Sequence, residues 1–137
     1  MKFNYSTRIK IRFRDLDAFG HVNNVVYLTY FEEARVAYCK QLGIFVELTK
    51  SPISFIILDN YCKYEVPLRV LEAIDVFVRI AELKSKSFQF QYKIVLADSE
   101  RIVATGYSTA VAYDYSKRQT IPIPDEVRKK IKDFEGI

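Results

Sequence analysis

The chain has 137 residues, with 21 basic and 17 acidic side chains and a formal net charge of +4 at pH 7. Its length indicates one domain spanning residues 1–137 and excludes a scaffold such as a (β/α)₈ barrel of about 250 residues. Hydrophobic residues make up 50% of the chain and aromatic residues 15%, which excludes a disordered polymer. The mild positive charge suits a polyanionic small ligand and leaves nucleic acid open.

The side chains that most often bind metals are scarce. The one histidine is His21, and the two cysteines, Cys39 and Cys62, match no zinc spacing. We therefore expect no metal site and two reduced, mostly buried thiols, with a single disulfide as the alternative. Residues 1–14 contain no apolar run of signal-peptide length, and the uncharged stretch 18–31 is too short and too polar to span a bilayer. We expect a cytoplasmic protein without a membrane span.

The first regular element is a strand at residues 8–14. Ile9, Ile11 and Phe13 alternate with basic residues, so one face of this strand is expected to be buried. The alternation stops at residues 15–23, which predicts a loop.

A long helix is predicted for residues 24–42, because apolar side chains recur there every three or four positions. Its apolar surface is wider than one stripe, which favours a helix wrapped by other elements. Asn23 or Asn24 suits the N-cap, and Gly43 suits the position after the last turn.

The rest of the chain predicts strands and one more helix. Four segments have strand character, namely 53–64, 72–83, 87–96 and 101–115. The links at 84–86 and 97–100 are short enough for antiparallel hairpins. Residues 125–134 carry acids first and bases later, as a helix prefers. The expected fold class is α+β, with a long helix wrapped by a five-stranded antiparallel sheet and a short C-terminal helix.

The densest polar segment, residues 14–24, lies between the first strand and the long helix. It holds Asp15, Asp17, His21 and two asparagines. Backbone N–H groups at a helix N-terminus can stabilise an oxyanion, and an upstream carboxylate can act as nucleophile or general base. The alternative is a turn whose Asp and Asn side chains cap the helix.

Several motifs resemble one family over essentially the whole chain. Residues 12–24 read RFRDLDAFGHVNN and residues 30–35 read YFEEAR; KSF stands at 86–88 and PIP at 122–124. Together with the segment 101–115, they resemble the 4-hydroxybenzoyl-CoA thioesterase-like branch of the hotdog-fold acyl-CoA thioesterases. The resemblance implies hydrolysis of an acyl-CoA to a free acid and coenzyme A, with no cofactor.

The resemblance also implies roles within the polar segment. Asp17 matches the catalytic carboxylate, as nucleophile or as general base, and the backbone N–H of Asn24 is the nearest candidate oxyanion donor. Asp15 is expected to be structural, holding Arg14 or the turn. His21 is expected to line the acyl pocket or to hydrogen-bond Asp17, with a purely structural histidine as the alternative.

Further candidates follow from the same resemblance. A sister branch places its catalytic acid on the central helix, so Glu32 and Glu33 are rival carboxylates, with a salt bridge to Arg35 as the structural alternative. The expected contacts to coenzyme A are Lys86, Ser87, Lys117 and Arg118, each of which could instead be a solvated hairpin residue. The residues that could face the acyl group, or simply be core, are Tyr27, Phe31, Ile56 and Ile57.

The family is built on dimers whose sheets join edge to edge, with active sites at the interface. We therefore expect a homodimer, and further a homotetramer. Alternative functions are a non-catalytic acyl-CoA-binding domain, a thioesterase for acyl-carrier protein and, less favoured, a dehydratase or hydratase. Binding of nucleic acid through the basic first strand is disfavoured, since no nucleic-acid motif is present.

Overall fold

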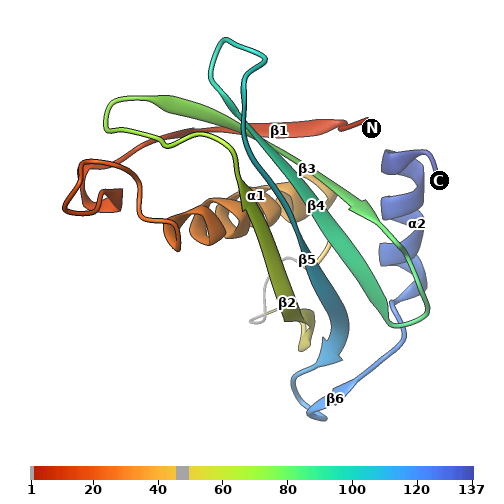
Figure 1. The fold of residues 1–137 in the computed structure, drawn as a ribbon. Helices are drawn as coiled ribbons and strands as arrows, with labels where there is room; N and C mark the ends of the chain where they lie inside the picture. The colour runs from red at the N-terminus through yellow and green to blue at the C-terminus, as the bar shows by residue number, and fades with distance from the viewer. Residues whose placement is uncertain (1, 46–49) are drawn as a thin grey trace.

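The computed structural model describes residues 2–45 and 50–137. Its elements in chain order are β1 (Tyr5–Lys10), the 3₁₀ turn η1 (Phe13–Asp15), α1 (Val26–Leu42), β2 (Ile53–Tyr64), β3 (Ala73–Ala81), β4 (Ser87–Leu96), β5 (Ile102–Asp114), β6 (Gln119–Thr120) and α2 (Asp125–Glu135) (Figure 1). The strands form one antiparallel sheet in the order β1-β3-β4-β5-β2, with β6 paired to the end of β5.

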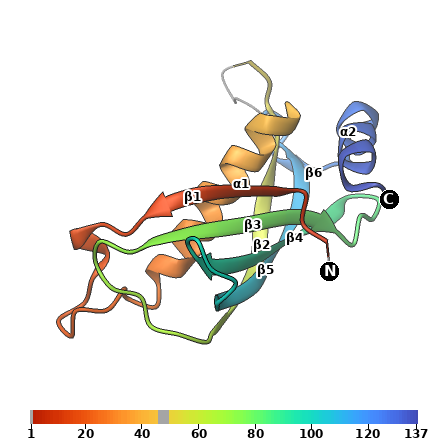
Figure 2. The ribbon, with the colours of Figure 1, turned by 90° about the horizontal axis from the view of Figure 1, so that it is seen from above.

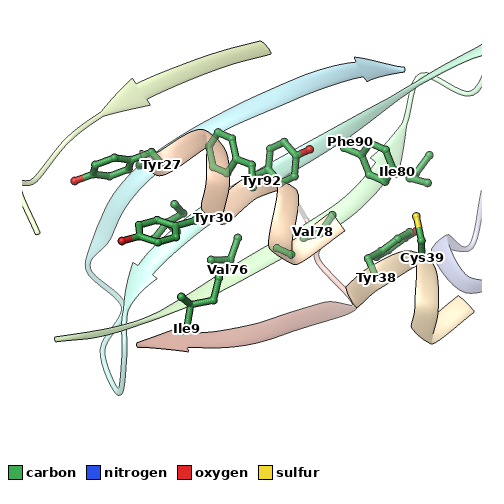
Figure 3. Close-up of a cluster of buried hydrophobic side chains, with 14 of the residues drawn as sticks. Ile9, Tyr27, Tyr30, Tyr38, Cys39, Val76, Val78, Ile80, Phe90 and Tyr92 are labelled. Carbon is green, nitrogen blue, oxygen red and sulfur yellow. The ribbon is translucent and has the colours of Figure 1, made fainter. Parts of the chain in front are cut away.

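The sheet curves around α1, which lies across its inner face (Figures 1 and 2). Every second residue of β3 and β4 is buried against the helix, as the alternation in the sequence predicts. The helix contributes Tyr30, Phe31, Ala34 and Tyr38, each with 0% of its surface exposed. Figure 3 shows Tyr30 and Tyr38 of α1 beside side chains of the sheet such as Val76, Val78 and Phe90. The expected α+β arrangement is confirmed.

Among the described residues the sheet has six strands and not the predicted five. The additional strand β6 has two residues, Gln119 and Thr120, which pair with Asp114 and Tyr113 of β5. A strand of two residues cannot show an alternation, so the sequence carried no signal for it.

The first strand is displaced from its predicted position. It ends at Lys10, and Phe13, predicted to share the buried face with Ile9 and Ile11, is 83% exposed. The reason is the turn η1, in which the backbone N–H of Arg12 donates to the Asp15 carboxylate at 3.0 Å. This turn brings Asp15 to the inside in place of Phe13.

The long helix begins two residues later than predicted. Val25 occupies the N-cap position without a side-chain cap, so neither Asn23 nor Asn24 is the N-cap. Asn23 instead closes a turn before the helix, where its Oδ1 accepts the Val25 N–H at 3.1 Å. The predicted end is correct, since Gly43 follows the last turn with a left-handed φ of 70°.

The C-terminal helix and the two cysteines agree with the sequence-based expectations. The helix α2 extends one residue beyond the predicted 125–134. Its Arg128 side chain donates to the carbonyls of Lys84 and Ser85 at 2.8 and 3.0 Å, which fixes the helix to the β3–β4 hairpin. Both cysteines are free thiols; Cys39 is buried, which raises its pKa to about 12, and Cys62 is half-buried. No helix within 2–45 and 50–137 is long and apolar enough to cross a membrane.

Candidate active site

The polar segment folds as a narrow turn between η1 and α1. Leu16 and Val22 form an antiparallel bridge, and the Asp17 N–H donates to the His21 carbonyl at 2.8 Å. The Gly20 N–H closes the turn onto the Asp17 carbonyl at 3.1 Å, with a φ of 79° that suits glycine. Asp17 and His21 therefore face each other across the turn.

The Asp17 carboxylate is half-buried and is anchored through one oxygen. Its Oδ1 accepts the Phe19 N–H at 2.8 Å and the His21 N–H at 3.4 Å. Within the described part of the chain, no group donates to its Oδ2. The Asx turn considered from the sequence thus exists, but it occupies Oδ1 and leaves Oδ2 available for chemistry.

His21 contacts Asp17 through its backbone. Its backbone also forms an isolated bridge with Arg69, on the loop between β2 and β3. No hydrogen bond joins the imidazole to Asp17 among the residues that the structure describes. The predicted link between His21 and Asp17 is therefore present as a main-chain contact and not as a side-chain pair.

The start of α1 leaves the Asn24 and Tyr27 N–H groups without an acceptor among the described residues. The Val22, Asn23, Val25 and Val26 N–H groups all have acceptors within the chain. Asn24 lines a pocket of about 300 Å³ together with Val22, Tyr27, Tyr64, Glu65, Val66 and Pro67. A free N–H beside a small cavity near a helix N-terminus is suited to bind a carbonyl oxygen or oxyanion.

Asp15 supports this turn from inside, as a structural role predicts. Its Oδ2 accepts the Tyr30 hydroxyl at 2.8 Å, and its Oδ1 pairs with Arg12 Nη2 at 3.1 Å. The partner is Arg12 and not the predicted Arg14. Burial opposes ionisation of Asp15, but the hydrogen bonds from Arg12 and Tyr30 and the charge of Arg12 outweigh it, so its pKa lies below the ordinary value.

The four predicted acyl-facing residues occupy different surroundings. Tyr27 is 3% exposed and lines the pocket at Asn24. Phe31 lies in the core and stacks on Tyr92. Ile56 pairs with Val111 and Ile57 with Ala110, so the two isoleucines point to opposite faces of the sheet. Ile57 packs against the core beneath α1, whereas Ile56 faces away from the helix.

The predicted coenzyme A contacts gather at the far end of the sheet. The Lys86 carbonyl accepts the Ala112 N–H at 2.9 Å, and Ser87 pairs with Val111. Lys117 and Arg118 lie just beyond, in an exposed turn at the end of β5. The buried Asp114 fixes this turn by accepting the Ser116 and Lys117 N–H groups at 2.9 and 3.1 Å.

Within one protomer these contacts are far from Asp17. Phe88, next to Ser87, stacks on Phe45, which follows the C-terminal end of α1. Asp17 precedes the N-terminal end of the same helix. The helix has 17 residues, which corresponds to a length of about 25 Å. One protomer therefore does not bring Asp17 and the predicted coenzyme A contacts together.

The rival carboxylates on α1 are exposed. Glu32 has 65% of its side chain exposed and forms the ion pair with Arg35 that the sequence suggested, at 3.6 Å. Glu33 is exposed as well. Across residues 2–45 and 50–137, no three His, Cys, Asp or Glu side chains group closely enough to hold a metal ion.

Some residues of the site were not predicted from the sequence. Tyr64, the last residue of β2, donates its hydroxyl to the Asn24 carbonyl at 2.7 Å. Tyr30, on α1, reaches Asp15 with its hydroxyl. Arg69 and Arg101 line a second pocket of about 430 Å³ on the side of His21. These residues are distant in sequence from the motif, so no local pattern connects them to it.

Comparison with known proteins shows the family of the chain. A family model described as the Thioesterase-like superfamily matches residues 11–131. The long-chain acyl-CoA thioesterase FadM of Escherichia coli (strain K12) is 28% identical over 128 residues, covering 93% of this chain and 97% of that protein. The chloroplastic acyl-acyl carrier protein thioesterase ATL3 of Arabidopsis thaliana is 28% identical over 131 residues, covering 95% of this chain and 68% of that protein.

A solved structure gives the same result for the fold. The thioesterase complexed with coenzyme A and Zn from Thermus thermophilus superposes with a TM-score of 0.86 at 27% identity, covering 98% of this chain and 96% of that one. Fold and family define the class, a thioester hydrolase built on the hotdog fold. The chain belongs to the Thioesterase-like superfamily. The expected family and fold are confirmed.

Proposed function

We propose that this protein hydrolyses an acyl-CoA thioester, with Asp17 as the catalytic carboxylate and the Asn24 N–H as an oxyanion donor. The observation that carries the proposal is a carboxylate oxygen of Asp17 and the N–H of Asn24, both without a partner among the described residues, on the short segment between η1 and α1, where Asn24 lines a pocket. The similarity to acyl-CoA thioesterases supports the substrate class.

The chemistry requires few groups. The thioester oxygen accepts a hydrogen bond from the Asn24 N–H while Oδ2 of Asp17 attacks the carbonyl carbon or removes a proton from an attacking water. Collapse of the tetrahedral intermediate expels the coenzyme A thiolate, which needs no strong acid. In the nucleophilic route, water then hydrolyses the mixed anhydride; in the general-base route, the acid forms directly. Both routes yield a free acid and coenzyme A.

The distance between Asp17 and the four coenzyme A candidates supports a site shared by two subunits. Asp17 of one subunit would act on a substrate whose nucleotide is held by Lys86, Ser87, Lys117 and Arg118 of another. The edge strand β2 supplies a surface for such a dimer: it has 12 residues, pairs on one side with β5, and exposes Leu58 and Tyr61. We further propose that dimers pair into tetramers.

Light scattering at working concentration tests the assembly. A homodimer or homotetramer is expected, and a monomer that hydrolyses acyl-CoA at full rate would contradict a shared site.

Release of free thiol from a panel of substrates tests the activity. The panel holds acetyl-, octanoyl-, palmitoyl- and benzoyl-CoA, with palmitoyl-acyl carrier protein as a separate arm because of the similarity to ATL3. Turnover of at least one acyl-CoA is expected. Turnover of the carrier-protein thioester alone would change the proposed substrate class from acyl-CoA to acyl-carrier protein. Equilibrium binding of acyl-CoA without turnover would instead indicate a binding domain.

A further inference from the structure

We propose that Tyr30 and Tyr64 are positioning residues that hold the two ends of the turn carrying Asp17 and the Asn24 N–H. Tyr30 comes from α1 and Tyr64 from the end of β2, so the turn is fixed from two sides by elements far apart in sequence. The catalytic consequence rests on the function proposed above, whereas the effect on the turn itself does not.

Tyr30 holds the beginning of the segment. The residue is 0% exposed, and its hydroxyl donates to Asp15 Oδ2 at 2.8 Å. Asp15 bonds to residues on both sides of the turn. Its carboxylate accepts the Arg12 N–H at 3.0 Å, and its carbonyl accepts the Asn23 N–H at 3.0 Å. A shift of Asp15 would therefore move the arm that leads to Asp17 and the arm that leads to Asn24.

Tyr64 holds the end of the segment. Its hydroxyl donates to the Asn24 carbonyl at 2.7 Å. Its ring packs edge-on against Tyr27, with centroids 4.9 Å apart, and both tyrosines line the same pocket as Asn24. The hydrogen bond fixes the residue whose N–H is the proposed oxyanion donor.

Two features make such support necessary. The N-cap residue of α1, Val25, makes no side-chain cap, so the usual device that fixes a helix start is missing. Oxyanion stabilisation also depends on a donor held in place before the reaction begins. Burial raises the pKa of both tyrosines, so both hydroxyls keep the proton that they donate.

The chain offers a matched control in Tyr38. It is 0% exposed on the same helix, and its hydroxyl donates to Glu135 of α2, at the opposite end of α1 from the turn. In Figure 3 the hydroxyls of Tyr27 and Tyr30 lie at one end of the cluster and Tyr38 at the other. Loss of each hydroxyl by Tyr→Phe removes one hydrogen bond and leaves the ring in place.

Steady-state kinetics on the acyl-CoA that the wild type turns over most rapidly tests the catalytic part. Tyr30→Phe and Tyr64→Phe are each expected to lower kcat by about 10-fold or more, since small misplacement of reacting groups is costly. KM and the Kd for coenzyme A are expected to stay within about twofold of wild type. Tyr38→Phe is expected to keep kcat within about twofold. Unchanged kcat in both test variants, or an equal fall in Tyr38→Phe, would overturn the proposal.

Hydrogen–deuterium exchange separates this inference from the proposed function, because it needs no substrate. The amides of residues 17–24 are expected to exchange at least about fivefold faster in Tyr30→Phe and Tyr64→Phe than in wild type or Tyr38→Phe. Wild-type exchange rates in both test variants would refute the positioning role. Faster exchange in an enzyme inactive on every thioester would support the positioning and refute the proposed function.

Discussion

Phe31 of α1 stacks on Tyr92 of β4, with ring centroids 4.1 Å apart and planes 4° from parallel. The stack is possible because residue 106 of the neighbouring strand β5 is glycine. A Cβ at this position would lie 2.7 Å from the Phe31 ring and 2.2 Å from the Tyr61 carbonyl oxygen. The close approach of α1 to the sheet therefore depends on Gly106.

Gly106→Ala is expected to destabilise the protein by at least about 1–3 kcal/mol, because the clash involves backbone as well as a packed ring. The midpoint of urea unfolding measures this. Gly136→Ala is the control: its added methyl group meets nothing within 4 Å, and only its left-handed backbone, φ 71°, is strained. Equal midpoints for wild type and Gly106→Ala would show that the sheet and helix can move apart freely.

Glu32→Gln and Glu33→Gln are expected to retain kcat within about threefold of wild type. Both carboxylates are exposed on α1, and Glu32 is paired with Arg35 at 3.6 Å, away from the turn that carries Asp17. Initial rates of thiol release on the best acyl-CoA provide the comparison. Loss of activity in either variant would indicate that the substituted glutamate on α1, and not Asp17, is the catalytic carboxylate.

Stability is expected to fall as the pH drops below about 4, partly through Asp15. The pKa of Asp15 is lower in the folded state than in the unfolded chain. Its ionised form therefore stabilises the fold above the unfolded pKa, and this contribution is lost as the pH falls through the folded pKa. The buried Asp114 also has a lowered pKa, mainly because of hydrogen bonds from Ser116 and Lys117. It therefore contributes to the same loss of stability at low pH.

Asp15→Asn tests this contribution. It is expected to lower the free energy of unfolding at pH 7 by about 1–3 kcal/mol and to flatten its decline between pH 5 and 2. Urea unfolding at several pH values measures both effects. The exposed Asp98 supplies the control variant Asp98→Asn. If the free energy of unfolding of Asp15→Asn fell as steeply between pH 5 and 2 as that of the wild type, the titrating group would be another residue.

Lys86→Ala is expected to raise KM for acyl-CoA by about 10-fold and to leave kcat unchanged, because a phosphate contact remote from the thioester contributes equally to ground and transition states. Lys84→Ala, two residues away and equally exposed in the same hairpin, is the matched control. A KM that rises equally in both variants would indicate general electrostatic attraction and not a specific contact.

Local patterns predicted most of the fold. The bounds of β2 and β4, the end of α1 and the start of α2 all match, because alternation, helical spacing and Gly43 are properties of short segments. The errors lie where tertiary contacts decide. Asp15, bonded to Arg12 and Tyr30, ends the first strand early and leaves Phe13 outside. Val25 is the N-cap of α1, where an asparagine was expected.

The candidate site was predictable only in part. The motif predicted roles for Asp17 and Asn24, and both residues lie on the segment that connects η1 to α1. The hydroxyls of Tyr30 and Tyr64 were missed, because no local pattern indicates which buried tyrosine reaches a loop 15 or 40 residues away. The separation of Lys86 from Asp17 likewise depends on how the sheet folds around α1.

The most direct measurement of the central claim compares Asp17→Asn with wild type in single-turnover hydrolysis of the best acyl-CoA. The substitution keeps Oδ1 to accept the Phe19 N–H, so the turn and coenzyme A binding are expected to be preserved, while the hydrolysis rate falls by at least about 1,000-fold. Asp98→Asn, with the same loss of charge, is expected to hydrolyse at the wild-type rate. Hydrolysis by Asp17→Asn at the wild-type rate would contradict the catalytic role of this carboxylate.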